Sequence, residues 1–216
     1  MMKVKLGFGV DDDIACMDAI GKAIQGKPIR LMIDTNHAYG RAEALRLGRA
    51  VEEHDLLWYE EPVAPEDIGG YAELRKQLAM PIAGGENEHT VFGFQNFLSA
   101  GAVDIAQPDI GSCGGITAAR HIIAVAQSLG VRVNPHVWGS AVAQAASLQV
   151  IAAVPVANHS LFATEPVLEY DRSSHPFRQE LVAEPFRLQD GWVQVPDRPG
   201  LGIEIDRDVV AQYDTL

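Results

Sequence analysis

Short apolar runs alternate with segments of helical spacing along most of this 216-residue chain. The runs have the composition of buried strands and occupy residues 3–8, 29–34, 56–60, 80–86, 103–109, 131–136 and, with weaker patterning, 160–170. Segments with apolar residues three or four positions apart lie between them, at residues 42–54, 69–79, 90–101 and 117–130. Each helix returns the chain to the start of the next strand, so the strands must run parallel. This pattern predicts an α/β protein whose sheet is buried on both faces.

Titratable side chains recur at the carboxyl ends of six of these runs. They are Asp34, Glu60, Glu86, Asp109, His136 and Glu169. Neighbouring members are separated by 23 to 33 residues, about one strand–helix unit. In a (β/α) barrel the carboxyl ends of all strands meet at one mouth, where the active site forms. In an open doubly wound sheet they spread along a line and do not easily converge. The pattern therefore favours a barrel.

The number of runs favours an incomplete barrel. Seven runs are present where a closed barrel needs eight strands, and the first run begins at residue 3. Near the end of the chain, Asp190 and Gly191 lie between apolar residues, which is typical of a tight hairpin. We expect residues 1–185 to form a barrel domain without its first strand. Residues 186–216 are predicted to be an extension that packs on the barrel or on a capping region.

Three of the strand-end groups are carboxylates on consecutive predicted strands, namely Asp34, Glu60 and Glu86. Carboxylates held together without a cation repel one another and raise one another's pKa. A hard divalent cation relieves this repulsion, and an all-oxygen ligand set favours Mg²⁺ over zinc or copper. We therefore predict a Mg²⁺ site at these residues. The alternative is that each carboxylate caps a helix or pairs with an arginine.

Two acid–base groups are predicted on opposite sides of that site. Lys3 and Lys5 alternate along the first run, so their side chains share one face. Inside a barrel the two ammonium groups should lower each other's pKa, which makes one a usable general base. Across the barrel, Asp109 beside His136 would fix the imidazole tautomer and raise its basicity. The alternatives are an exposed solubilising edge for the lysines and a structural role for the histidine.

The ordered set of motifs resembles the mandelate racemase subgroup of the enolase superfamily. The segments that carry the resemblance, through essentially the whole chain, are KVK (3–5), DTN (34–36), WYEEP (58–62), GGEN (84–87), QPD (107–109) and NPHVWG (134–139). The resemblance implies a TIM-like (β/α)7β barrel with Mg²⁺ on the three carboxylates. It also implies that Lys5, with Lys3 beside it, is one base and that His136 with Asp109 is the other.

Further site residues follow from the same resemblance. Asn36 is implied to help hold the metal or the substrate, and Glu169 to hydrogen-bond the substrate carboxylate. His37, on a loop at the catalytic end, and Trp138 are candidates for contact with substrate, although packing explains Trp138 equally well. Glu61 follows Glu60 and is expected to point to the opposite face, either as a structural group or as a group that supports the metal ligands.

The resemblance implies abstraction of the proton α to a carboxylate. Such a proton is a very weak acid, so its removal needs a base and positive charge at the carboxylate oxygens. Segments 6–13, 34–40, 60–67, 135–149, 168–181 and 199–206 are similar to the galactarolactone cycloisomerases and sugar-acid dehydratases. That similarity implies β-elimination on an aldaric acid or its lactone. The alternatives are a racemase or epimerase of a 2-hydroxy acid using the same bases, and an inactive truncated barrel that acts only in assembly.

The family's usual N-terminal capping domain and first barrel strand are expected to be absent from this chain. Their absence would leave apolar surface and open sheet edges for other chains to cover. The resemblance also implies a homo-oligomer.

The composition restricts the partners. The formal net charge is −12 and no stretch concentrates lysine and arginine, which argues against nucleic acid or an anionic membrane as partner. No apolar window reaches about 18 residues, and no signal peptide is recognisable. Cys16 and Cys113 form no paired motif. We expect a cytoplasmic protein whose partner is a small carboxylate.

Overall fold

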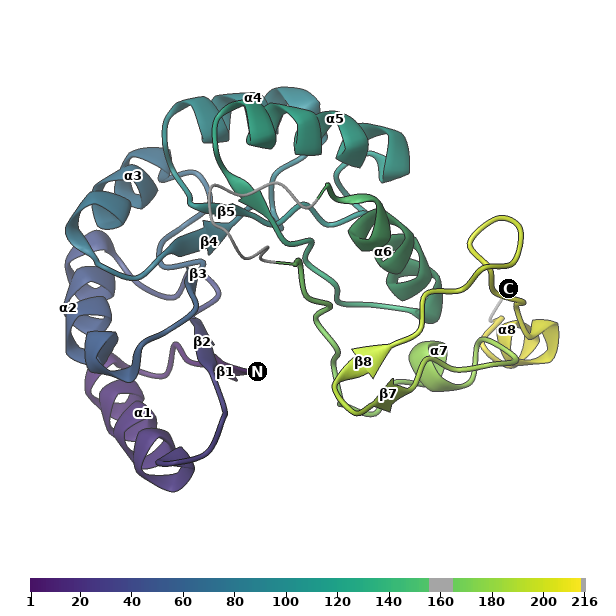
Figure 1. Ribbon diagram of the computed structural model, residues 1–216, viewed down its shortest axis with the longest axis horizontal. Helices are drawn as coiled ribbons and strands as arrows, with labels where there is room; N and C mark the ends of the chain where they lie inside the picture. The colour runs from purple at the N-terminus through teal and green to yellow at the C-terminus, as the bar shows by residue number, and fades with distance from the viewer. Residues whose placement is uncertain (156–164, 215–216) are drawn as a thin grey trace.

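The computed structural model describes residues 1–155 and 165–214. In these residues six parallel strands lie side by side in chain order, and helices cover one face of the sheet (Figure 1). The strands are β1 (Met2–Lys5), β2 (Leu31–Asp34), β3 (Tyr59–Glu60), β4 (Ile82–Gly84), β5 (Ile105–Ala106) and β6 (Arg132–Val133). The helices that follow them are α1 (Val10–Ile24), α2 (Arg41–Val51), η1 (Glu52–His54), α3 (Ile68–Gln77), α4 (Thr90–Ser99), α5 (Gly115–Ser128) and α6 (Ala141–Ala153). The predicted parallel α/β architecture is confirmed.

The sheet of the described residues curves but does not close, because β1 and β6 each have a neighbour on one side only. Figure 1 shows the resulting arc, with strands inside and helices outside. Part of the predicted seventh strand, residues 160–164, lies outside the described residues. Residues 165–170 are described and are not a strand, so that part of the prediction is wrong. Their backbone is held by a side chain instead: Val167 N donates to Asn134 Oδ1 at 2.7 Å.

Alternate residues of each strand pack on opposite faces of the sheet. One face contributes to a large apolar cluster shared with the helices, and its buried strand residues are Leu31, Ile33, Tyr59, Ile82, Ala106 and Val133. The other face forms a small separate cluster of Met32, Trp58, Ala83 and Ile105 on the concave side. Lys3 is in register with Met32, and Lys5 with Asp34, which is in register with Glu60. Both lysines and both carboxylates therefore project to the concave face, as predicted for the lysines.

Two of the helices that cover the sheet form where none was predicted. In α1, Val10, Ile14 and Met17 recur at helical spacing and pack on the sheet. Three acidic residues, at positions 11–13, occupy the first turn of α1, where the helix dipole favours negative charge. In α6, apolar and small residues occupy all sides of the helix, so its sequence lacks the amphipathic pattern that predicts a helix.

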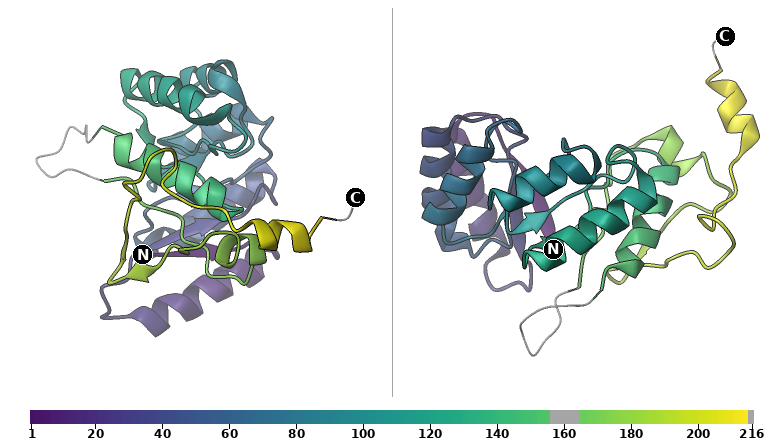
Figure 2. Two further views of the ribbon diagram at one scale, coloured as in Figure 1. Left: turned by 90° about the vertical axis from the view of Figure 1, so that its right-hand side faces the viewer. Right: turned by 90° about the horizontal axis from the view of Figure 1, so that it is seen from above.

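The C-terminal part contains the predicted hairpin. Strands β7 (Leu188–Gln189) and β8 (Trp192–Val193) pair antiparallel. Asp190 and Gly191 between them both have positive φ, 51° and 85°, as a tight two-residue turn requires. Two short helices, α7 (Pro176–Gln179) and α8 (Arg207–Gln212), flank the hairpin, and Figure 2 shows α8 projecting away from the sheet. The predicted boundary at residue 186 remains a prediction.

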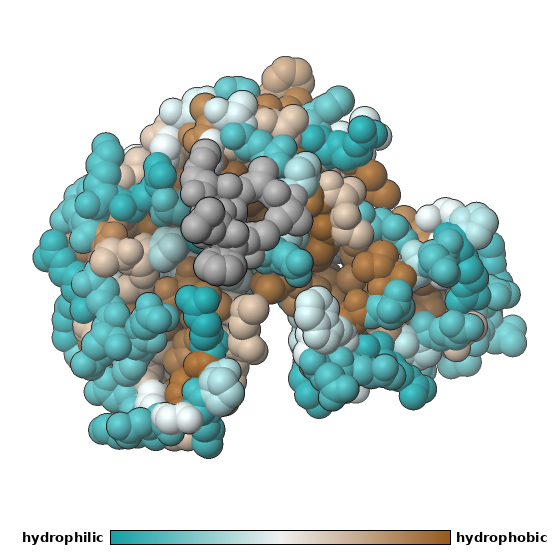
Figure 3. All heavy atoms as spheres, viewed as in Figure 1, coloured by the Kyte–Doolittle hydropathy of each residue, from teal (hydrophilic) through white to brown (hydrophobic). Residues whose placement is uncertain are grey.

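Most of the surface in the view of Figure 3 is hydrophilic, and hydrophobic residues are visible along the sides of the opening in the arc. No helix within residues 1–155 or 165–214 has the length and apolar content needed to cross a bilayer. Both cysteines are free thiols; Cys16 is exposed and Cys113 is buried.

A buried carboxylate fixes the loop between β1 and α1. Asp13 is 1% exposed and accepts from the N–H groups of Gly7 at 2.8 Å and Phe8 at 3.3 Å. It also accepts from the Tyr39 hydroxyl, at 2.5 Å. The carboxylate thus ties the end of β1 to the loop after β2, next to the strand that carries the lysines.

We expect Asp13→Ala to lower the free energy of unfolding by about 2 kcal/mol, because buried donors lose their acceptor. Urea unfolding followed by circular dichroism measures the change. Asp197→Ala, at an exposed position outside the helices and strands, serves as the control and is expected to change stability by less than about 0.5 kcal/mol. Equal stability of Asp13→Ala and wild type would contradict this account of the loop.

Candidate active site

The two lysines of β1 reach the carboxylates of the neighbouring strands. Lys3 Nζ donates to Glu60 Oε1 at 2.6 Å and also to Glu169, and it lies 3.5 Å from Asp34 Oδ2. Lys5 Nζ donates to Asp34. The side chain of Lys3 is 19% exposed and that of Lys5 is 59% exposed. Lys3 therefore lies among the carboxylates, whereas Lys5 lies at the open side of the site.

Two side chains fix the carboxylate of Glu60 on the concave side of the sheet. Its Oε2 accepts from Trp58 Nε1 at 2.8 Å and from Gln107 Nε2 at 2.9 Å. Burial, together with the negative charges of Glu169 and Asp34, raises the pKa of Glu60 to about 8, against the opposing effect of Lys3. The neighbouring carboxyl behaves in the opposite way. Burial would raise the pKa of Asp34, but Lys3 and Lys5 outweigh it and lower that pKa.

The predicted pairing of His136 with Asp109 is present on the other side of the site. His136 Nδ1 lies 2.7 Å from Asp109 Oδ2, and Nε2 lies 3.2 Å from Glu86 Oε2. Burial lowers the pKa of His136, but the bond to Asp109 and the charges of Glu169 and Glu86 outweigh it and raise that pKa to about 8. Burial also raises the pKa of Glu86, although the charge of His136 opposes this shift. The bond to His136 lowers the pKa of Asp109 despite its burial.

Glu169 connects the two sides. One oxygen accepts from Lys3, and the other accepts from the backbone N–H of Val137 at 2.9 Å, one residue beyond His136. The strand-end groups predicted to converge thus form one contiguous set of contacts. The carboxyl ends of β4, β5 and β6 come earlier than predicted, so Glu86, Asp109 and His136 lie on the loops that follow these strands.

One predicted property of the lysines is wrong. Mutual repulsion was expected to lower their pKa values, but the structure gives a raised pKa for Lys3. Burial does oppose the charged form of Lys3, yet the carboxylates of Glu60, Glu169 and Asp34 outweigh it. Lys3 therefore remains an ammonium group at neutral pH and is a source of fixed positive charge.

Asp34, Glu60 and Glu86 suit a hard divalent cation by their chemistry. The donor set is oxygen only, Asp34 and Glu60 are fully buried, and burial together with neighbouring carboxylates raises the pKa values of Glu60 and Glu86. In the structure the three carboxylates lie against Lys3, Lys5, His136 and Asn36 rather than against one another. Their ligand atoms do not all lie within 4.8 Å of each other.

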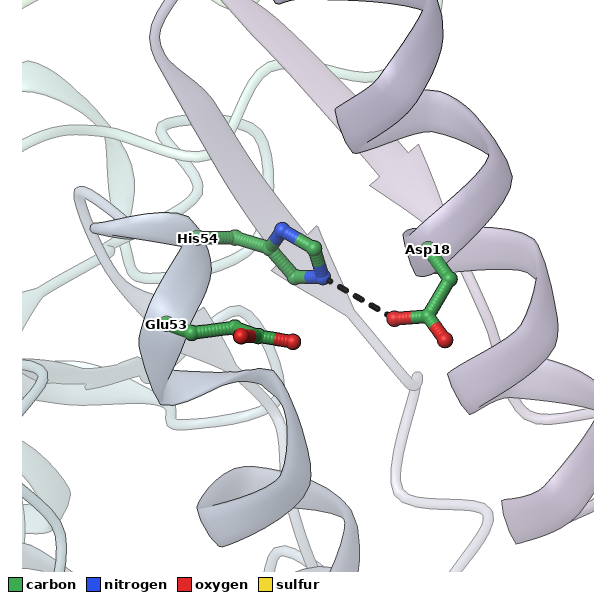
Figure 4. A group of neighbouring side chains, drawn as sticks. All are labelled: Asp18, Glu53 and His54. Atoms are coloured by element: carbon green, nitrogen blue, oxygen red, sulfur yellow. Dashed lines mark ion pairs between the residues drawn. The ribbon is translucent and has the colours of Figure 1, made fainter.

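One set of three side chains among the described residues meets that spacing, and it lies elsewhere. Asp18 and His54 form an ion pair between α1 and η1, with 3.5 Å between Asp18 Oδ1 and His54 Nε2, and Glu53 lies beside them (Figure 4). The His54 ring packs against the helix at Gly21, where an added Cβ would come within 2.8 Å of the ring. This set shares no residue with the strand ends, and we interpret it as an interhelical ion pair.

The remaining predicted residues lie at the same rim. Asn36 donates its backbone N–H to Asp34 Oδ1 at 2.8 Å, and its Nδ2 lies 3.5 Å from Glu86 Oε1. His37 Nδ1 lies 3.1 Å from Glu61 Oε2. Trp138 is 65% exposed, so a contact between it and substrate stays a prediction.

Several residues that shape the site were not singled out from the sequence. They are Trp58, Gln107, Asn87 and Asn134. Trp58 and Gln107 each lie two positions before a strand-end residue, Glu60 and Asp109. That spacing, which keeps side chains on one face of a strand, is the signal that could have identified them.

Comparison with known proteins supports the predicted resemblance. A family described as "Enolase C-terminal domain-like" matches residues 1–209. The D-galactarolactone cycloisomerase of Agrobacterium fabrum is 45% identical over 211 residues, covering 98% of this chain and 56% of that protein. The crystal structure of a 3,6-anhydro-D-galactonate cycloisomerase from Zobellia galactanivorans matches with a TM-score of 0.89 at 40% identity, covering 98% and 57% of the two chains.

This chain is also similar in structure to a sugar-acid dehydratase. The crystal structure of a mutant L-talarate/galactarate dehydratase liganded with Mg and L-glucarate matches with a TM-score of 0.82 at 31% identity. The match covers 97% of this chain and 49% of that one. The chain thus spans about half the length of the relatives it matches.

Proposed function

The chain belongs to the enolase C-terminal domain-like family, and from this membership and the strand-end geometry we propose that it removes the proton α to a carboxylate. The proposed substrate is a sugar acid or its lactone, and the proposed reaction is a β-elimination of the cycloisomerase or dehydratase type. The observation that supports this most directly is the convergence of Lys3, Glu60 and Glu169 with Lys5 on one side and the Asp109–His136 pair on the other.

We propose Mg²⁺ as the cofactor, with Asp34, Glu60 and Glu86 as the residues that would hold it. Bound there, the cation would supply positive charge to the carboxylate oxygens of the substrate. Lys3 adds a fixed positive charge beside the same position, since the surrounding carboxylates keep it protonated. Glu169, between Lys3 and the N–H of Val137, is proposed to meet the substrate carboxylate.

Lys5 and His136 are the proposed bases because they approach the carboxylates from opposite sides. The base that lies nearer the α-proton accepts it, and that base must be neutral to do so. With Nδ1 bonded to Asp109, Nε2 of His136, which lies 3.2 Å from Glu86 Oε2, is the ring nitrogen proposed to accept the proton. Substrate handedness decides which base acts.

Elimination then requires a leaving oxygen on the β-carbon. The electron pair left on the α-carbon forms a carbon–carbon double bond as the bond to the β-oxygen breaks. A conjugate acid of the site returns a proton to that oxygen, and the resulting enol becomes a 3-deoxy-2-keto acid. In a lactone the leaving oxygen is the ring oxygen, so the same step opens the ring.

The test is to incubate the chain with D-galactarolactone and MgCl₂ in deuterated water and to follow proton NMR spectra. We expect loss of the α-proton signal together with formation of a keto acid, and EDTA should stop both. A deuterated substrate epimer without keto acid would instead support a racemase or epimerase with the same two bases. A folded chain that exchanges no α-proton in lactones or aldarates would contradict the proposal and favour a role in assembly alone.

A further inference from the structure

One buried carboxylate beside the site has no place in the proposed chemistry. Glu61 is 1% exposed and directly follows Glu60. Its Oε1 accepts from Asn87 Nδ2 at 2.9 Å. Its Oε2 accepts from Asn36 Nδ2 at 3.2 Å and lies 3.1 Å from His37 Nδ1. The sequence predicts Glu61 on the far face, as a structural group or as support for the metal ligands, whereas its carboxylate contacts the loops at the mouth of the site.

The backbone around Glu61 is held in an uncommon conformation. Asn36, His37 and Glu61 have φ values of 44°, 51° and 45°, in the left-handed region that residues other than glycine rarely adopt. The carbonyl oxygen of Glu61 accepts from His37 N at 2.8 Å and from Thr35 Oγ1 at 2.9 Å. Such backbone persists only where surrounding contacts fix it, so the two loops hold each other in place.

These contacts connect the three segments that carry the proposed metal ligands. Asn36 lies two residues after Asp34 and bonds to it, Glu61 follows Glu60, and Asn87 follows Glu86. We infer that Glu61 is a positioning residue that sets the spacing of the three proposed ligands by binding both asparagines with one carboxylate. This inference rests on the proposed function, because the ligand roles are part of it.

The experiment is a calorimetric titration of the full chain with MgCl₂. We expect Glu61→Ala to weaken Mg²⁺ binding by on the order of ten- to a hundredfold, as is typical when a partner of a metal ligand is lost. Glu61→Gln keeps one acceptor oxygen and should recover part of the affinity. Glu66→Gln removes the same charge from an exposed position of the same loop and should bind as wild type.

Asn87→Ala tests the same inference if a substitution at the buried Glu61 unfolds the chain. Its side chain is exposed, so the fold should survive while one of the three segments is released and Mg²⁺ affinity falls. Nitrogen–proton correlation spectra give a second readout that needs no metal. We expect Glu61→Gln to shift the amide signals of residues 35–37 and 86–88, and Glu66→Gln to leave them in place.

Wild-type Mg²⁺ affinity in both Glu61→Ala and Asn87→Ala would overturn the inference. If the wild-type chain binds no Mg²⁺, the proposed function fails and the amide signals decide the inference. Shifts at residues 35–37 and 86–88 then support a positioning role for Glu61, whereas shifts confined to residues 60–62 overturn it.

Discussion

Lys5→Met or His136→Asn is expected to lower the rate of α-proton exchange by about 10³-fold, with the larger loss in the variant that lacks the base facing the substrate proton. Each change removes the group that accepts a proton on one side of the site and leaves the carboxylates in place. Exchange in deuterated water, followed by proton NMR with D-galactarolactone and with its α-epimer, measures the loss for each handedness. We expect the two variants to show opposite preferences.

The controls replace the same residue types on the helix layer. Lys22→Met in α1 and His121→Asn in α5 alter exposed side chains and should exchange protons at the wild-type rate. Wild-type exchange by both Lys5→Met and His136→Asn would remove these residues from the proposed chemistry.

The second large effect is expected at the carboxylates. Glu60→Gln or Glu86→Gln should weaken Mg²⁺ binding by more than about a hundredfold, beyond the range seen when only outer partners of a metal ligand change. Each removes one of the three carboxylates proposed to hold the cation, at a site where burial and neighbouring carboxylates raise the pKa values of Glu60 and Glu86. Calorimetric titration with MgCl₂ measures the affinity directly.

Thermal unfolding provides an independent measure of the same binding. At a Mg²⁺ concentration about 100 times the dissociation constant, the cation stabilises the wild-type chain by about 2.7 kcal/mol, and this gain should be absent in the variants. Glu53→Gln is the matched control, because Glu53 belongs to the interhelical set with Asp18 and His54. Loss of Mg²⁺ binding in Glu53→Gln, with binding retained in Glu60→Gln, would place the cation at the wrong site for this chemistry.

The sequence predicts the site better than it predicts the strands. Alternation places Lys3 and Lys5 on one face, and parallel topology brings Asp34 and Glu60 to the lysines. The first prediction follows from the two-residue repeat of side chains along a strand, and the second from the alternation of strands and helices. Both patterns can be read from the sequence. The ends of the strands cannot be predicted in the same way. Hydrogen bonding between strands stops where the loops turn, although the apolar residues continue beyond that point.

The pKa of Lys3 and the direction of the Glu61 side chain differ from the predictions because both depend on neighbours distant in the sequence. The pKa of Lys3 depends on which charges surround it, and carboxylates outnumber ammonium groups there. The role of Glu61 depends on left-handed turns that bring Asn36 and Asn87 to its carboxylate. Simple alternation from Glu60 could not indicate that, since the chain leaves the strand between the two glutamates.

The most direct measurement is a crystal structure of the chain with Mn²⁺, located by its anomalous signal in place of Mg²⁺. We expect one peak within coordination distance of a carboxylate oxygen from each of Asp34, Glu60 and Glu86, with Lys5 and His136 on either side. No peak there, or a peak only between Asp18, Glu53 and His54, would contradict a metal site at the strand ends.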